Sequence, residues 1–425
     1  MRWSKTLVAT SIVGMLTLGC DRGPTDPAAE PDGMQVTGAQ QVLSNSPMAT
    51  LGKKIFFDAT LSINQNQSCA SCHDPDWGWT GPDPALNAAG AVYEGSIPGR
   101  FGNRKPPSSA YATPSPVFYL SKKGLFEGGN FWDGRATGEL LGNPAADQAQ
   151  GPFVNPAEQA LPDFACVIYR IQQGPYIADY VSVWGDDITT IVFPTSTATA
   201  CATEGSTVTL TPADRDKAYA EYDRVALSIA SFEASPEVNA FNSRFDTGRL
   251  TKQEQRGYAL FRGKGKCARC HIANSPSALF TDFTFDNLGV PKNPVNPATL
   301  TGFVDEGLGA FLLTRPEWAQ LADDEMGKVK VPTLRNVGER AGSGVKAYAH
   351  NGYFKSLWQI VHFYNTRDTK PTCAGDLTVD AAIAAGCWPA PEVAENVNDS
   401  ELGDLGLSYD EELAIVAFMK ALTDQ

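Results

Sequence analysis

The sequence has few histidines and no excess of basic residues. Only four of its 425 residues are histidines, namely His73, His271, His350 and His362, so a metal site rich in imidazole must draw on these four. Lys and Arg number 34 against 48 Asp and Glu, which gives a net charge of −14. Phosphate backbones would repel such a chain. This charge argues against a nucleic-acid partner and leaves room for a basic or neutral protein partner.

Long apolar runs are also missing beyond the first twenty residues. A short basic start precedes apolar residues 7–18, and Cys20 follows, an order that is typical of an export signal. The cysteine predicts lipoprotein processing with the lipid on Cys20, although cleavage further on would discard that residue. We expect a lipoprotein signal over 1–20 and a flexible tether over 21–46. The mature chain is then periplasmic and touches the membrane only through its lipid anchor.

Two short motifs use half of the histidines. Residues 69–73 (CASCH) and 267–271 (CARCH) both match C-x-x-C-H. In this spacing two thiols form thioethers with porphyrin vinyl groups, and the adjacent imidazole reaches the iron. A thioredoxin-type pair would need a βαβ context, and a zinc site would need all four thiols together. We predict two covalently bound haem c groups, held by Cys69, Cys72, His73, Cys267, Cys270 and His271.

The surroundings of the two motifs repeat as well. Residues 48–58 precede the first motif and residues 251–263 precede the second, and both segments show apolar residues at helical spacing. Two similar units about 200 residues apart imply two similar domains. The sequence thus predicts a mainly α fold of two cytochrome c-like haem domains, over 47–235 and 236–425, with long loops and little β-structure.

Four cysteines remain once one lipid site and four haem sites are subtracted from nine. In an oxidising compartment they are expected to form two disulfides, for which three pairings exist. Proximity in the sequence favours Cys166–Cys201 and Cys373–Cys387. These bonds staple surface loops or, alternatively, shape a surface on which a partner docks.

Short segments between and after the haem motifs carry a family resemblance. They occur in a specific order: FWDGRA at 131–136, DQA at 147–149, GP at 151–152, NPAE at 155–158, VPTLRN at 331–336 and YAHNG at 348–352. With these segments the chain resembles the bacterial di-haem cytochrome c peroxidases and their relative MauG, from about Leu51 to Leu422. Residues 103–112, with the long segment from FWDGRA to GP, are similar to the MauG-like branch that includes MbnH.

The resemblance implies that peroxide reacts at the N-terminal haem, opposite a distal Glu and Gln that match Glu158 and Gln148. A carboxylate above an open iron can move a proton between the peroxide oxygens and so assist O–O cleavage. Trp132 matches the tryptophan that lies between the two haems and relays electrons. Without the resemblance, Glu158 would be interpreted as a solvated loop acid and Trp132 as a core aromatic.

A histidine of the better-known family members is absent. In those enzymes a His on a loop after the first haem motif caps the N-terminal haem until reduction opens it. Between His73 and His271 this sequence has neither His nor Met. Lys105 and Lys122 are poor substitutes because amines are mostly protonated at neutral pH. We expect the N-terminal iron to stay open without reductive activation.

Two candidates exist for the sixth ligand of the second haem. His362 is the chemical first choice because imidazole is a common haem ligand. His362 and Tyr364 face roughly 200° apart on a helix, so only one of them can serve. In the family the ligand lies fourteen residues after the His of the His-Asn-Gly segment, which from His350 gives Tyr364. The peroxidases usually place Met there and MauG places Tyr. We favour Tyr364, and His362 stays open.

The resemblance also implies a Ca²⁺ between the haem domains. Its ligands are an Asn after Arg and backbone oxygens of a Thr-x-Pro segment. Here Lys105 follows Arg104, and residues 345–347 are Val-Lys-Ala. A lysine cannot coordinate calcium, so calcium binding is in doubt. His350 is expected to be a structural, hydrogen-bonded histidine rather than a ligand.

Two functions follow for such a chain. The first is a MauG-like enzyme that uses hydrogen peroxide at an open N-terminal haem and a Tyr-ligated C-terminal haem to form high-valent iron and oxidise a periplasmic partner protein. The alternative is a cytochrome c peroxidase that reduces peroxide to water with electrons from a small cytochrome or copper protein. A plain electron-transfer cytochrome is a third option, against which the Glu158 and Gln148 segments argue.

Overall fold

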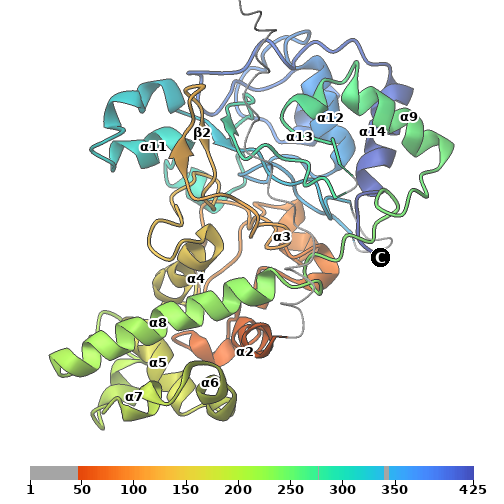
Figure 1. Ribbon diagram of the computed structural model, residues 1–425. Coiled ribbons are helices and arrows are strands. Elements are labelled where there is room, and N and C mark those ends of the chain that lie inside the picture. Colours follow the sequence, from red (N-terminus) through yellow and green to blue (C-terminus); the bar gives the residue numbers. More distant parts are fainter. Residues whose placement is uncertain (1–45, 276, 339–343) are drawn as a thin grey trace, which may run out of the picture. The chain divides into compact units, whose positions relative to one another are not determined.

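Helices dominate the molecule and strands are only two residues long, which confirms the mainly helical fold with little β-structure (Figure 1). The structure is a computed structural model that describes residues 46–275, 277–338 and 344–425. Its helices are α2 (Pro47–Phe56), α3 (Pro84–Ala88), α4 (Pro144–Val154), α5 (Ala165–Gln172), α6 (Ile177–Trp184), α7 (Thr197–Ala200), α8 (Pro212–Glu233), α9 (Lys252–Arg262), α10 (Pro297–Leu300), α11 (Gly307–Leu313), α12 (Leu357–Thr366), α13 (Val379–Ala385) and α14 (Tyr409–Lys420).

Each haem motif follows a helix that is capped by its own sequence. The Ser46 hydroxyl accepts a hydrogen bond from the backbone of Ala49 at the start of α2, and Thr251 forms a reciprocal capping box with Glu254 at the start of α9. Both helices end before a loop in which a 3₁₀ turn carries the first cysteine, η2 (Cys69–Ser71) or η5 (Cys267–Arg269). The two predicted entry helices are therefore present.

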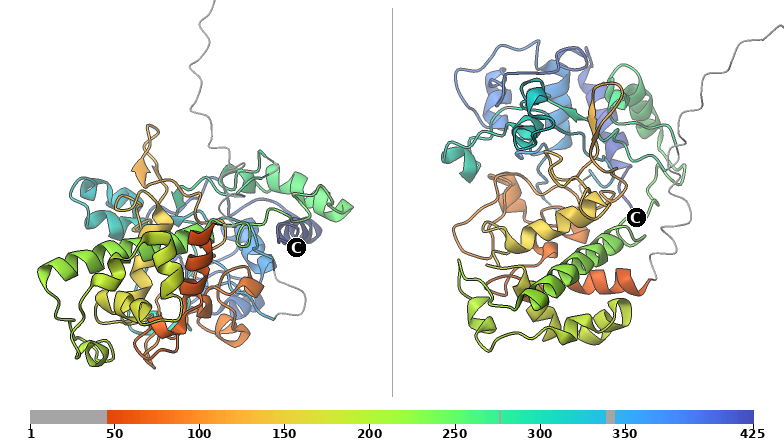
Figure 2. Two further views of the ribbon diagram at one scale, coloured as in Figure 1. Left: turned by 60° about the horizontal axis from the view of Figure 1, so that its bottom comes forward. Right: turned by 60° about the vertical axis from the view of Figure 1, so that its left-hand side comes forward.

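The first entry helix packs against the long helix α8. Figure 2 shows α2 and α8 side by side in both views, and α8 also contacts α4 and α5. The apolar cluster between these helices contains Leu51, Ile55 and Phe56 of α2 and Val225 and Ile229 of α8, among others. Helical spacing of these residues explains why α2 presents one apolar face.

The second entry helix packs against the C-terminal helix α14, which also contacts α12. Phe261 of α9, Phe363 of α12 and Phe418 of α14 are all fully buried in a second apolar cluster. A glycine lies at each of the two helix crossings: Gly52 faces the backbone of α8, and Gly257 faces that of α14. A Cβ at either position would overlap a carbonyl oxygen of the facing helix, so both crossings depend on glycine.

Two short antiparallel ladders link the loops. Strand β1 (Tyr119–Leu120) pairs with β2 (Phe126–Glu127), and β3 (Phe285–Asp286) pairs with β4 (Val329–Lys330). A third, small apolar cluster forms where Phe118, Phe126 and Phe285 meet α11. This cluster places the segment before Trp132 beside the segment after the second haem motif.

Both predicted disulfides are present. Cys166 is bonded to Cys201 and Cys373 to Cys387, across separations of 35 and 14 residues. Among the described helices, none is long and apolar enough to cross a membrane. The predicted signal over 1–20 and the lipidation of Cys20 lie outside the described residues.

Candidate active site

A cavity of about 410 Å³ is lined by residues of both C-x-x-C-H motifs. Segments far apart in the sequence converge on this cavity. Each motif loop follows an entry helix, α2 or α9, that packs against a second helix. The predicted site residues that line the cavity are Cys69, Cys72, His73, Trp132, Gln148, Glu158, Cys267, Cys270, His271 and Tyr364. His362 is not part of this lining.

The two motif histidines are oriented in the same way. His73 Nδ1 lies 3.2 Å from the backbone oxygen of Trp79, and His271 Nδ1 lies 2.8 Å from that of Phe280. A carbonyl can only accept, so Nδ1 carries the proton and Nε2 is the nitrogen left for a metal. Burial lowers the pKa of both imidazoles, that of His73 to about 4. Both rings are therefore neutral near pH 7, as an iron ligand must be.

The four motif cysteines are free thiols, whereas the other four described cysteines are disulfide-bonded. Burial raises the pKa of all four thiols. A redox-active C-x-x-C pair needs the opposite shift. Two pairs of thiols, each beside a cavity-lining imidazole whose Nδ1 is held by a backbone oxygen, therefore fit two covalently attached haems.

Gln148 and Glu158 line the half of the cavity that holds the first motif. Gln148 lies on α4, and a turn after that helix places Glu158, whose backbone oxygen accepts a hydrogen bond of 2.7 Å from Ser96. No described residue hydrogen-bonds either side-chain head. Burial raises the pKa of Glu158, and the charge of Arg135 partly opposes this shift. The carboxyl group is thus free to exchange protons with a small molecule in the cavity.

Arg135 also lines the cavity and was missed by the sequence analysis. Its guanidinium stacks 3.9 Å above the Phe131 ring and pairs with Asp133 at 2.6 Å. All three residues belong to the FWDGRA segment, which supplied the signal for Trp132. Phe131 and Arg135 line the cavity together with Trp132, and the charge of Arg135 acts on Glu158. One segment thus contributes several residues to the site.

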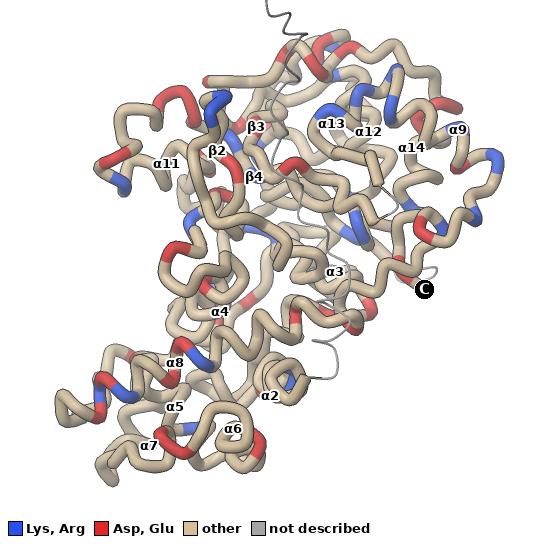
Figure 3. The backbone as a smooth tube through the Cα atoms, in the orientation of Figure 1, with Lys and Arg blue, Asp and Glu red and all other residues tan. Residues whose placement is uncertain are grey.

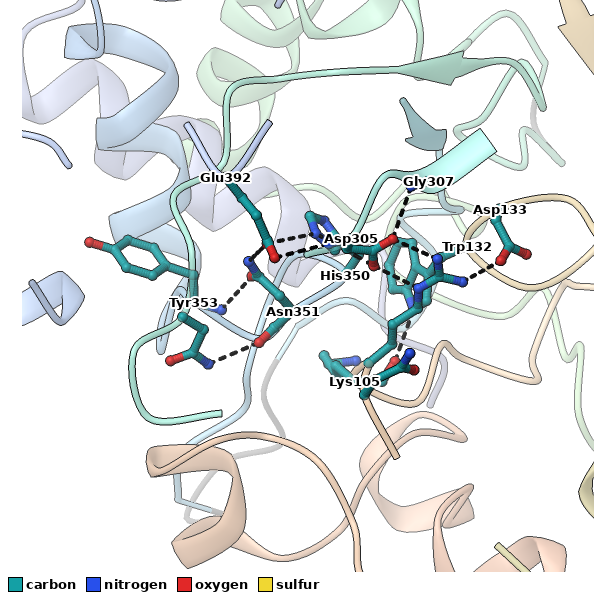
Figure 4. A network of polar contacts seen from close by, with 12 residues as sticks. Lys105, Trp132, Asp133, Asp305, Gly307, His350, Asn351, Tyr353 and Glu392 are labelled. Atoms are coloured by element: carbon teal, nitrogen blue, oxygen red, sulfur yellow. Dashed lines mark hydrogen bonds and ion pairs between the residues drawn. The ribbon is translucent and has the colours of Figure 1, made fainter. Parts of the chain in front are cut away.

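Trp132 lines the cavity and lies beside Lys105, Asp305 and His350 (Figure 4). Its Nε1 donates a hydrogen bond of 2.8 Å to the backbone oxygen of Lys105, and its own backbone oxygen accepts one of 2.8 Å from Lys330. The indole is buried, and its ring centroid is 6.4 Å from that of His350. Trp132 is therefore held rigidly by the N-terminal segment on one side and by β4 on the other.

Helix α12 presents Tyr364 to the second half of the cavity. Leu357, Ile360, Val361 and Tyr364 line the cavity from one face of this helix, as expected for positions spaced by three and four. His362 lies on the other side, where its Nδ1 contacts Glu412 at 2.9 Å and its ring stacks on Trp358. Burial raises the pKa of Tyr364, and no described residue hydrogen-bonds its hydroxyl. The geometry places Tyr364, not His362, within reach of the cavity.

Ammonium groups occupy the segments that would bind calcium. Lys105 Nζ donates to Thr80 Oγ1 and to the Pro106 oxygen at 2.9 Å each, and Lys346 Nζ donates to the Asn336 oxygen at 2.7 Å. Both lysines are buried. A second cation beside them would be repelled, so these residues do not fit a calcium site.

His350 differs from the expectation of a hydrogen-bonded histidine. Its Nε2 lies 3.9 Å from Asp305 and 3.7 Å from Glu392, and neither ring nitrogen has a hydrogen-bond partner among the described residues. Asp305 is instead bound by Arg104 at 2.6 Å (Figure 4). Arg104 and Asp305 are 201 positions apart, which explains why the sequence pattern could not place them together.

Comparison with known proteins places these features in a family. Residues 46–255 match the model of the family described as di-haem cytochrome c peroxidase. The methylamine utilization protein MauG of Paracoccus denitrificans is 32% identical over 407 residues, 92% of each chain. The cytochrome-c peroxidase IdrP2 of Denitromonas iodatirespirans is 28% identical over 90% of this chain and 83% of its own. The diheme peroxidase BthA of Burkholderia thailandensis superposes with a TM-score of 0.68 at 28% identity, over 89% of this chain and 86% of that one.

Proposed function

This chain belongs to the di-haem cytochrome c peroxidase and MauG family, whose enzymes act on hydrogen peroxide, and from this premise we propose that it oxidises a partner protein in the manner of MauG. Tyr364 is the observation that carries the proposal. It lines the cavity, no described residue hydrogen-bonds its hydroxyl, and an oxygen donor stabilises oxidised iron better than a thioether does.

Two covalently bound haems would supply the redox chemistry, held by the motif cysteines with His73 and His271 as iron ligands. Glu158 then acts on the peroxide itself. Its carboxylate takes a proton from one peroxide oxygen and returns it to the other as the O–O bond breaks, so that water leaves. Gln148 donates a hydrogen bond that orients the peroxide in the cavity. Arg135 moderates the rise in the pKa of Glu158 and so keeps more of it ionised.

Trp132 is proposed as the relay between the two haem sites. Its indole donates a hydrogen bond to the backbone oxygen of Lys105, and its backbone oxygen accepts one from Lys330, so segments before and after position 235 both hold it. A rigid, buried indole changes its surroundings little when an electron passes. The two-domain division at 235 and 236 fits this role, with the relay at the contact of the halves.

The charge around the second haem loop favours an acidic partner, which the net charge alone did not indicate. Basic residues are frequent just before α9, on α9 and in the following loop (Figure 3): Arg249, Lys252, Arg256, Arg262, Lys264, Lys266 and Arg269. Lys264 pairs with Glu411 and Arg269 with Glu401, whereas no described carboxylate pairs with Lys252 or Arg256. Unpaired charges of one sign steer an oppositely charged protein to this side. The rate of partner oxidation should therefore fall as ionic strength rises, and Arg256→Glu should weaken that dependence.

The alternative function is reduction of peroxide to water with electrons from a small cytochrome or copper protein. The two functions differ in what the resting, fully oxidised holoenzyme does with peroxide in the absence of a reductant. A MauG-type enzyme should react at once, with changes in the near-infrared and Mössbauer spectra of both haems. A reaction that requires prior reduction would contradict the proposal and favour the alternative.

A pair of variants tests the ligand assignment. Tyr364→Phe removes the hydroxyl with which α12 can ligate the second haem iron. The absorption and electron paramagnetic resonance spectra of this haem should therefore change. His362→Ala serves as the matched control and should leave these spectra as they are. The reverse outcome would make His362 the ligand.

A further inference from the structure

A chain of aromatic rings leads from the second haem site to the surface. It starts at Tyr364 in the cavity lining and ends at Tyr409, which is 61% exposed. We propose that the oxidising equivalents taken from hydrogen peroxide leave the second haem site along this chain, through Trp388 and Trp358 to Tyr409, where the partner protein donates its electrons. This inference rests on the proposed function and adds the exit that the partner would use.

The inner part of the chain crosses helix α12. The ring centroids of Tyr364 and Phe363 are 6.1 Å apart, and Phe363 meets Trp388 edge-on at 5.1 Å. Trp388 is buried, and its Nε1 donates a hydrogen bond of 3.0 Å to Thr366 at the end of the same helix. Tyrosine and tryptophan are the oxidisable members here, while Phe363 fills the short gap between them.

The outer part of the chain runs along the far side of α12. The His362 ring lies 5.9 Å from Trp388 and stacks on Trp358 at 5.0 Å. Trp358 in turn meets Tyr409 edge-on at 5.9 Å. No step between neighbouring ring centroids exceeds 6.1 Å, so an electron can move inward in short steps.

Trp358 is equipped to lose a proton together with an electron. Its Nε1 donates a hydrogen bond of 2.9 Å to Glu412, which is 2% exposed. Burial by itself would raise the pKa of Glu412, but hydrogen bonds from His362, Asn365 and Trp358 hold it below its ordinary value. The carboxylate is therefore ionised and lies within proton-transfer distance of the indole.

Trp358 gives one electron toward the second haem site, which uses up one of the two oxidising equivalents of a peroxide molecule. Its Nε1 proton moves to Glu412. An electron from the partner through Tyr409 restores the indole, and Glu412 returns the proton. The route operates twice for each peroxide. One oxygen leaves as water when the O–O bond breaks, and the second leaves as water after the partner has given two electrons through Tyr409 and solvent has supplied two protons.

Local charge gives the chain a direction. The ammonium of Lys370 lies 5.7 Å above the Trp388 ring and makes positive charge there costly, whereas Glu412 makes it favourable on Trp358. The oxidising equivalent is thereby drawn outward. The disulfide Cys373–Cys387 keeps Trp388 in place, because the backbone nitrogen of Cys373 donates a hydrogen bond of 2.8 Å to the Trp388 oxygen.

The test adds peroxide to the holoenzyme without a partner and freezes the mixture for electron paramagnetic resonance, with ring-deuterated Trp or Tyr to identify each radical. Peptide mass mapping then locates oxidised side chains. Wild-type protein should show a Trp signal and a Tyr signal, with products on Trp358 and Tyr409. Trp358→Phe and Trp388→Phe should abolish the Tyr409 signal, and Glu412→Gln should shift the Trp signal from the neutral to the protonated radical.

Two variants keep the result interpretable. Trp184→Phe replaces a half-buried indole far along the sequence from the route and should change nothing. Tyr409→Phe alters only an exposed ring and should move the oxidation products back to Trp358. Normal peroxide consumption with no product on Trp358 or Tyr409 would overturn the exit route alone. A wild-type protein that consumes no peroxide would overturn the proposed function and the route with it.

Discussion

The two C-x-x-C-H regions are built alike but differ in the side chains that line the cavity near them. In each, a capped helix leads into a 3₁₀ turn, and the motif histidine points Nδ1 at a backbone oxygen, that of Trp79 or that of Phe280. Across the cavity, Glu158 and Gln148 line the part near the first motif, whereas Tyr364 lines the part near the second. In the proposed function, the same attachment unit serves peroxide chemistry in one place and electron storage in the other.

The aromatic surroundings of the two regions differ in the same sense. Near the first motif, Trp79 packs edge-on against Phe56 and Phe232 and is itself buried. Phe57, the exposed ring of that cluster, is not oxidisable under mild conditions. Near the second motif, Trp and Tyr rings continue to the exposed Tyr409. Rings near the first motif also reach an exposed tyrosine, because Tyr222 meets Phe164 and Phe164 meets Tyr219. Tyr222 does not line the cavity, however, whereas Tyr364 does.

The largest effect that would sharpen this contrast is expected at Glu158. Glu158→Gln keeps the size and polarity of the side chain but removes the group that moves the peroxide proton. The rate of reaction with peroxide should fall by about 10²- to 10⁴-fold, as for loss of a general acid–base group. Stopped-flow absorption of the resting holoenzyme measures this rate, and the spectrum of the second haem should stay as in wild type.

Glu233 offers a matched control, because it is a second buried carboxyl in the same lining. Glu233→Gln should lower the rate of reaction with peroxide much less than Glu158→Gln does. The pH profile gives a further check, since burial raises the pKa of Glu158. The rate should decline on acidification at a pH above the ordinary glutamate range, and Glu158→Gln should abolish this decline. Equal losses in both variants would mean that Glu158 has no special role.

The two disulfides allow a comparison of stability between the halves. Loss of Cys166–Cys201 by paired Ser substitutions should cost about 4 kcal/mol, and loss of Cys373–Cys387 about 3 kcal/mol, because the closed loops span 35 and 14 residues. Guanidinium unfolding followed by circular dichroism measures both losses. Only loss of the second disulfide should also weaken the Tyr409 radical signal, because Trp388 lies on the proposed route. A larger loss at the shorter loop would contradict loop closure as the main contribution.

Local patterns in the sequence predicted much of the site. The C-x-x-C-H spacing, the capped entry helices and the nearest-neighbour disulfides each involve residues close in the chain, where stereochemistry decides. Tyr364 and His362 could be separated because helical periodicity turns them to different sides of α12. These predictions needed no knowledge of distant contacts.

Contacts between distant segments were beyond such patterns. Arg135 was missed because its place beside Glu158 follows from the packing of two loops. The ammonium of Lys346 could not be placed from its neighbours, and the missing hydrogen bonds of His350 depend on Asp305 and Glu392, each more than 40 positions away. One signal was available but unused, since aligning the two entry helices places Gly52 over Gly257, each three residues before an aliphatic–Phe pair.

These two glycines give the last and smallest prediction. Gly52→Ala and Gly257→Ala should each lower the free energy of unfolding by about 1–3 kcal/mol, because the added Cβ forces the facing helices apart. Alanine has a higher helix propensity than glycine, and this gain offsets part of the loss in the free energy of unfolding. Gly151→Ala is the matched control: its Cβ would meet only the Phe131 ring at 3.4 Å, and the gain should then prevail. Equal losses at the two crossings would show that both haem regions rest on the same helix contact. A loss at one crossing alone would mean that the halves share a motif but not the packing beneath it.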